Sequence, residues 1–282
     1  MAASPPRAPT ALLTALALVA FAGNSILCRM ALADGEIGPI SFTCVRLASG
    51  ALVLTPVFLR ARGKRFERGW QLAPLALFVY AFAFSLAYTS LTTGTGALLL
   101  FGAVQGTMLG YGRVHGERLR PAQLAGLAAG MAGVVVLVAP GVAAPDPAGV
   151  VLMLLAGVSW GIYSLIGRGA RHPVASTARN FVLAAPLALL ALPFSIGSEA
   201  LEARGFLLAA ASGAVTSGGG YVLWYSALRG HSATSAAVLQ LAVPALTAAG
   251  GVLLLGEALT GRLVGASVLT LGGILTTIRA AR

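Results

Sequence analysis

Arg46 is the residue whose position in this 282-residue chain most clearly suggests binding chemistry. It stands about eight residues into an apolar segment, with apolar neighbours on both sides. An arginine at membrane depth is costly, so it usually faces a protein interior or an aqueous cavity. It could bind the carboxylate of a substrate or another anion. It could instead be structural, bonded to backbone carbonyls or extended to the outer membrane interface.

Side-chain amides inside apolar segments form a second group of candidates. Gln105 and Gln240 could hydrogen-bond a zwitterion. The alternative is a hydrogen bond between helices, which in membranes is worth about 1 kcal/mol or less. Asn24 and Asn180 present the same two alternatives.

Aromatic residues recur at helical spacing. Tyr80 and Phe84 share one helix face, and Trp160 and Tyr163 share another. Such stripes could form a cavity wall suited to amphipathic or aromatic cargo, or they could be packing or an interfacial belt. The predicted substrate-binding set is therefore Arg46, Gln105, Gln240, Asn24, Tyr80, Trp160, Tyr163, Asn180 and Tyr221.

Other chemistries find little support in the sequence. Glu117 and Glu257 each stand at the predicted start of a helix, where a carboxylate meets the favourable helix dipole, so we interpret them as structural. Metal-protease and serine-hydrolase motifs are absent, and Cys28 and Cys44 form no CxxC pair. We expect no cofactor, no metal and no enzymatic activity.

Composition identifies the class of protein. Hydrophobic residues make up 57% of the chain and charged residues 10%, with a mean hydropathy of +0.88. An ordinary soluble domain has about a quarter charged residues, so an all-α polytopic membrane protein is indicated. The net charge of +11 then reflects membrane topology rather than nucleic-acid binding.

Glycine, proline and charge divide the chain into ten apolar spans. They cover about 10–30, 38–59, 71–92, 95–112, 121–140, 147–167, 174–195, 205–228, 232–255 and 261–279. With the N-terminus in the cytoplasm, fifteen Lys and Arg residues fall inside and three outside. This bias predicts that both termini are cytoplasmic.

The two halves resemble each other at a spacing near 140 residues. Gly116-Glu117-Arg118-Leu119 corresponds to Gly256-Glu257-Ala258-Leu259. Five spans in each half imply two inverted five-helix repeats, at 10–140 and 147–279. Inverted repeats are typical of secondary transporters, whose substrate site lies near the midplane between the halves. Gly218-Gly219-Gly220 and Pro244 are candidate soft points in their helices.

The chain resembles the EamA-type permeases of the drug/metabolite transporter superfamily over nearly its whole length. The resemblance rests on the two Gly-Glu motifs, on Trp160-Gly161, and on Ala236-Ala237-Val238-Leu239 leading to Val243-Pro244-Ala245. It implies ten helices, residence in the inner membrane, and efflux or exchange of small metabolites. The first half departs from the pattern, with Val104-Gln105 where the second half has Pro244-Ala245.

The leading hypothesis is a secondary transporter of the inner membrane that exports or exchanges small metabolites, such as amino acids or related amphipathic compounds. An uptake permease and a non-transporting membrane scaffold are the alternatives. The expected partners are a small-molecule substrate and the lipid bilayer. Gly126-x-x-x-Gly130 and Gly261-x-x-x-Gly265 could mediate close contacts within the fold or in a homodimer.

Overall fold

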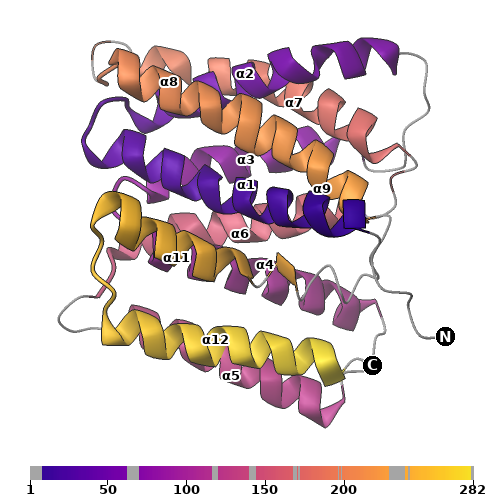
Figure 1. Cartoon of the computed structure of the whole chain (residues 1–282), viewed down its shortest axis with the longest axis vertical. Helices are drawn as coiled ribbons and strands as arrows, with labels where there is room; N and C mark the ends of the chain where they lie inside the picture. The colour runs from indigo at the N-terminus through magenta and orange to yellow at the C-terminus, as the bar shows by residue number, and fades with distance from the viewer. Residues whose placement is uncertain are drawn as a thin grey trace.

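The computed structural model describes residues 8–61, 70–115, 120–139, 144–167, 170, 172–195, 197, 199–228, 239–240 and 242–280. Within these ranges every regular element is a helix, apart from one isolated bridge between Ile37 and Leu201. Figure 1 shows helices lying side by side with their axes roughly aligned. Of the repeat motifs, Gly116–Leu119 and Ala236–Val238 lie outside the described residues.

The first half contains helices close to the predicted spans: α1 (Ala8–Ala33), α2 (Pro39–Arg60), α3 (Leu72–Ala87), α4 (Thr93–Val114) and α5 (Pro121–Val138). The second half contains α6 (Pro147–Gly167), α7 (Pro173–Leu189), the short 3-10 helix η1 (Leu192–Phe194), α8 (Ala203–Ala211), the π-helix η2 (Ser212–Gly219), α9 (Gly220–Leu228), α11 (Ala242–Leu255) and α12 (Gly261–Ala280). Proline opens α2, α5, α6 and α7, because its missing N–H is harmless in the first turn.

The length and composition of the helices confirm a multi-pass membrane protein. Seven helical stretches in the described ranges are long and apolar enough to cross a membrane, among them the continuous run Ala203–Trp224. Helices α3 and α11 are apolar but shorter, at 16 and 14 residues. The structure thus supports an all-helical membrane fold, and the full set of ten spans stays a prediction.

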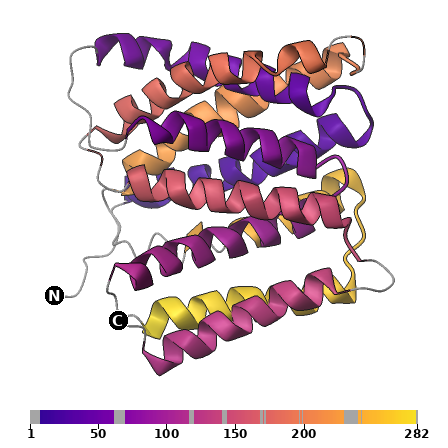
Figure 2. The ribbon, with the colours of Figure 1, turned by 180° about the vertical axis from the view of Figure 1, so that it is seen from behind.

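Helices α1 and α6 lie at the centre, and each packs against helices of the other half of the chain. Helix α1 contacts η2, α9 and α11, whereas α6 contacts α3 and α4. Figures 1 and 2 show these neighbours from the two sides of the molecule. The remaining large interfaces, α2 with α7 and α5 with α12, also join the halves. The interior between the halves is therefore built from both segments of the sequence.

Small residues allow the closest of these interfaces. At Gly126 and Gly133 of α5, a Cβ atom would collide with the backbone of α12. Thr277 and Thr270 of α12 donate hydrogen bonds to carbonyl oxygens of α5, at 3.2 Å and 3.4 Å. The Gly126 motif thus packs within the fold, while Gly261 and Gly265 have open space around them. In a membrane, burying apolar side chains between helices gains little free energy, because lipid is also apolar. Close approach of backbones at small residues therefore drives helix association.

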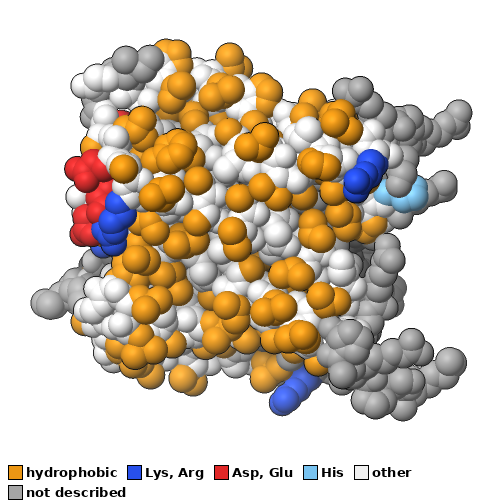
Figure 3. Space-filling model, turned by 45° about the horizontal axis from the view of Figure 1, so that its top comes forward, with side chains coloured by type: hydrophobic (Ala, Val, Ile, Leu, Met, Phe, Trp, Pro, Cys, Tyr) orange, Lys and Arg blue, Asp and Glu red, His pale blue; other side chains and the backbone are white. Residues whose placement is uncertain are grey.

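Charged residues gather at the two ends of the bundle. We call one the acidic end; it carries the connections with Asp34, Glu36, Asp146, Glu199, Glu202 and Glu257. The other, the basic end, carries Arg60, Arg113, Arg120 and Arg279. Figure 3 shows acidic side chains at one end of a largely hydrophobic face, with a few basic side chains beside them and near the opposite end. Helix α1 begins and α12 ends at the basic end (Figure 1).

Candidate functional site

Helix α2 carries Arg46 into the interior between the halves. The residue is 1% exposed, so it does not extend to the membrane interface. Its Nε donates a hydrogen bond to Ser217 Oγ at 3.2 Å, and its Nη2 donates one to the Tyr80 hydroxyl at 3.2 Å. Its Nη1 is buried and has no hydrogen-bond partner among the described residues. A buried cation with an unused donor is a costly arrangement that an anionic ligand would relieve.

Aromatic rings surround the same guanidinium. The Cζ atom of Arg46 lies 5.2 Å from the centre of the Tyr80 ring and 5.0 Å from that of Phe84. Both rings come from α3, where the i, i+4 spacing places them on one face. Their π-faces partly compensate the charge, since a cation within about 6 Å of a ring centre is attracted to it.

Asn24 of α1 connects this group to the second half of the chain. Its Nδ2 donates to the Tyr80 hydroxyl at 3.3 Å. Its Oδ1 accepts hydrogen bonds from Ser212 at 2.7 Å, from Ser217 at 3.3 Å and from Thr216 at 3.4 Å. The structure therefore brings three predicted residues, Asn24, Arg46 and Tyr80, into one hydrogen-bonded cluster.

The three hydroxyl residues all belong to the π-helix η2. A π-helix is rare and often marks a functional site, because its wider turn re-aims side chains. Here it is favoured by glycine, and Gly213 lies so close to α2 that a Cβ would overlap the Arg46 carbonyl oxygen. The sequence run Gly218-Gly219-Gly220 had indicated a weak point in this helix. It occupies the end of η2 and the first residue of α9.

Trp160 of α6 stands at the centre of an aromatic wall beside this cluster. Its ring centre lies 4.9 Å from that of Tyr80, 5.0 Å from that of Tyr221 and 5.3 Å from that of Tyr163. A cavity of about 20 Å³, here called the central cavity, is lined by Phe21, Asn24, Tyr80, Phe84, Trp160 and Tyr221, together with Ser25, Leu100, Phe101 and Thr216. This volume holds about one water molecule, so a solute can enter only if helices move.

A second polar group lies on α7, nearer the basic end. Asn180 Nδ2 donates to the Tyr163 hydroxyl at 3.4 Å, and Arg179 Nη2 donates to Asn180 Oδ1 at 3.3 Å. The Arg179 guanidinium also stacks on Trp70, 4.4 Å from its ring centre. These residues line a further cavity of about 20 Å³, here called the Asn180 cavity. Arg179 is one of the fifteen basic residues that the charge count places on the cytoplasmic side, and the structure buries it inside α7, where it is 5% exposed.

The two glutamines of the predicted set lie elsewhere. Gln105 is buried on α4, one turn beyond Phe101, and is not among the residues that line the central cavity. Gln240 is half-buried in the short described segment 239–240. For both, a role in binding stays a prediction.

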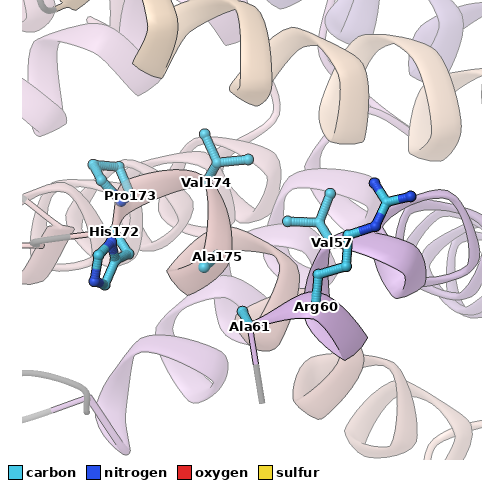
Figure 4. Close-up of a pocket in the computed structure, with 7 residues that line it drawn as sticks. All are labelled: Val57, Arg60, Ala61, His172, Pro173, Val174 and Ala175. Carbon is cyan, nitrogen blue, oxygen red and sulfur yellow. The ribbon is translucent and has the colours of Figure 1, made fainter. Parts of the chain in front are cut away.

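A larger cavity opens at the basic end between α2 and α7 (Figure 4). It has a volume of about 320 Å³ and is lined by Val57, Arg60, Ala61, His172, Pro173, Val174 and Ala175. Arg60 and His172 lie on opposite sides of it. Pro173 also lines the Asn180 cavity, whose residue Tyr163 contacts Trp160 of the central cavity. The three cavities thus neighbour one another in a series that starts at the basic end. Arg46 lines none of them, but its guanidinium contacts Tyr80 and Phe84, which line the central cavity.

The acidic end is closed by polar contacts between the halves. Both Glu257 oxygens accept hydrogen bonds from the Thr93 N–H, and Glu257 lies 3.5 Å from Arg29 Nε. In the same way Glu199 accepts the N–H groups of Ile40 and Ser41 at the start of α2. The sequence had placed Glu257 at the start of its own helix. The structure corrects this: the carboxylate caps α4, because the α11–α12 connection brings it to that helix end.

Replacing Glu257 by alanine is expected to destabilise the protein. The change removes the cap of α4 and the ion pair with Arg29, and a lost cap typically costs about 1 kcal/mol. The melting temperature of the detergent-purified protein should fall by roughly 2–4 °C for each kcal/mol lost. Glu202→Ala is the matched control, because this residue precedes α8 without a side-chain capping bond. Equal melting temperatures for the two variants would contradict the capping role.

These features together define a class. A multi-pass helical membrane protein whose interior holds a buried arginine, a polar cluster and an aromatic wall between its two halves has the construction of a membrane transporter. Comparison with known proteins agrees with that class. The model of the EamA-like transporter family matches residues 8–139 and again 147–279, so the chain belongs to this family. It is a membrane transporter of small solutes.

Individual relatives cover the chain almost end to end. An uncharacterized protein of Pseudomonas aeruginosa is 50% identical over 266 residues, covering 94% of this chain and 93% of that protein. An uncharacterized transporter of Archaeoglobus fulgidus is 32% identical over 260 residues, covering 85% and 86%. One crystal structure aligns with a TM-score of 0.69 at 24% identity and covers 98% of this chain and 99% of its own, which shows a shared fold.

Proposed function

We propose that this protein is a secondary transporter of the cell inner membrane that exports or exchanges small amphipathic metabolites, such as amino acids or related compounds, by alternating access. The observation that carries the proposal is the buried Arg46 guanidinium, whose Nη1 donor is unused among the described residues and whose neighbours Tyr80 and Phe84 line the aromatic central cavity. A carboxylate on Arg46 and an apolar group against Trp160 would satisfy both parts of the site. Uptake would use the same geometry, because solute gradients set the direction.

The asymmetry of the two ends supports alternating access. Contacts of Glu257 and Glu199 join the halves at the acidic end, whereas the series of cavities starts at the basic end. With the basic end in the cytoplasm, this arrangement corresponds to a closed outer path and a partly formed inner path. The small central cavity must expand to admit a solute, which a rocking motion of one half against the other would achieve.

Helices α1 and α6 each pack against helices of the opposite half of the chain, and this matching pattern supports two inverted repeats, at 10–140 and 147–279. If α6 corresponds to α1, then the contacts of α1 with α9 and α11 correspond to those of α6 with α3 and α4. A twofold axis between the halves produces such a pattern. Ten helices and two cytoplasmic termini follow from this arrangement.

A topology reporter tests the orientation. Alkaline phosphatase or green fluorescent protein fused after Arg282 should report a cytoplasmic C-terminus, because the basic end carries the excess of arginine. Insertion of the same reporter into the connection between α1 and α2, at Gly35, should report the opposite side. Phosphatase activity of the C-terminal fusion would overturn the ten-span arrangement.

Counterflow tests the function directly. The purified protein is reconstituted into liposomes preloaded with amino acids, carboxylic acids, sugars or nucleobases, and entry of the labelled compound is compared with protein-free liposomes. Accumulation of an amphipathic metabolite supports the proposal. Absence of counterflow over the whole panel contradicts it and favours a scaffold.

A further inference from the structure

Resting on the proposed function, we infer that the site selects organic anions, namely amphipathic carboxylates that carry no ammonium group, over the corresponding zwitterions. This narrows the substrate class beyond small metabolites in general. It follows from the charges and hydrogen-bond acceptors around Arg46.

The site near the central cavity carries a positive charge. The Arg46 guanidinium is buried, and the hydroxyls of Ser217 and Tyr80 that it contacts are neutral. A carboxylate bound to the unused Nη1 would make a charge-assisted hydrogen bond with a cation that has no acidic partner among the described residues. An α-ammonium on the same molecule would stand only a few ångströms from that cation and be repelled by it.

The acidic residues that could bind an ammonium group lie away from Arg46. All six acidic residues that the structure describes lie in connections at the acidic end, where Figure 3 shows acidic side chains gathered. Several of these carboxylates already have partners there. Glu257 accepts a hydrogen bond from the Thr93 N–H and pairs with Arg29. Glu199 accepts a hydrogen bond from a backbone N–H group at the start of α2, and Glu36 pairs with Arg204. These carboxylates are committed to closing that end of the bundle.

Neutral groups near Arg46 that could accept an ammonium group already have partners. Asn24 Oδ1 already accepts hydroxyl hydrogen bonds from Ser212 and Ser217, which occupy both of its lone pairs. The ring faces of Tyr80 and Phe84 already lie over the Arg46 guanidinium. The Asn24 oxygen and the two ring faces near Arg46 therefore already have partners, whereas the Arg46 Nη1 donor has none among the described residues. The site is complementary to a carboxylate attached to an apolar body.

Three solutes with one skeleton isolate this preference. 3-Phenylpropionate, phenylalanine and 2-phenylethylamine share a phenylethyl group, which matches the aromatic wall, and differ in charge as anion, zwitterion and cation. Each is measured by counterflow at neutral pH, with entry into protein-free liposomes subtracted. We expect 3-phenylpropionate to enter at least tenfold faster than phenylalanine, and 2-phenylethylamine to show no counterflow.

Variants tie the preference to Arg46. Arg46→Gln should lower the counterflow of 3-phenylpropionate to the rate of phenylalanine or below it, whereas Arg46→Lys, which retains the charge, should keep the order of the three solutes. Arg279→Gln is the control, since this exposed arginine lies at the end of α12 and should leave all rates unchanged. An Arg46→Gln variant that keeps the full preference would overturn the inference.

The outcomes separate this inference from the proposed function. If phenylalanine, or another zwitterion of the counterflow panel, enters as fast as or faster than 3-phenylpropionate, the protein is a transporter and the anion preference is wrong. If neither the three solutes nor the panel shows counterflow, both proposals fail together.

Discussion

Replacing Arg46 by alanine is expected to abolish counterflow while the protein still inserts in the membrane. The change removes the buried guanidinium and with it the hydrogen bonds to Ser217 and Tyr80. Truncating one partner of a buried, charged hydrogen-bonded pair typically costs about 2–5 kcal/mol. Because about 1.4 kcal/mol is a factor of ten in affinity, substrate binding should fall roughly 30-fold to 1000-fold or more.

Two controls separate binding from folding. The amount of protein in the membrane fraction and its elution volume in detergent should match those of the unmodified protein. Arg46→Lys retains the positive charge but loses the planar fork that bonds two partners at once, so it should keep part of the activity. Full activity of Arg46→Ala would remove Arg46 from the site.

Replacing Gly213 by alanine should have the second largest effect. A Cβ atom at this position would overlap the Arg46 carbonyl oxygen and Ser49 Oγ, and would stand 2.7 Å from the Arg46 carbonyl carbon. The obstacle is largely backbone, so α2 and η2 must separate. Overpacking of this kind typically costs about 1–3 kcal/mol. Separation also draws Arg46 away from Ser217 and disturbs the cluster around Asn24.

We therefore expect Gly213→Ala to lower both the melting temperature and the counterflow rate, the latter by about tenfold or more, because about 1.4 kcal/mol of lost site geometry is tenfold in rate. Gly219→Ala is the matched control in the same π-helix. The atom nearest to its added Cβ, the Ala214 carbonyl oxygen, is 3.6 Å away, which is an ordinary contact. If both variants behave alike, close packing of α2 on η2 does not position Arg46.

The sequence by itself determined the class of protein and the approximate helix boundaries. Composition indicated a polytopic helical membrane protein, and proline and charge marked helix ends that the structure places within a few residues for most spans. The two Gly-Glu motifs pointed to the EamA family, which the family comparison confirms. Arg46 could be singled out because a charged residue in an apolar span is costly wherever the helix faces.

Only the tertiary structure decided which residues meet. Ser217 joins Asn24 and Arg46 from a segment 193 and 171 residues away along the chain, through a π-helix that glycine content alone did not predict. Arg179, counted from the sequence only as a cytoplasmic-side charge, is a buried neighbour of Asn180, and Glu257 caps a distant helix. The physical reason is that lipid tails are as apolar as a protein core. The side chains on the lipid-facing and protein-facing sides of a membrane helix are therefore similarly apolar. The sequence does not show which side faces the protein interior, and the packing of neighbouring helices decides it.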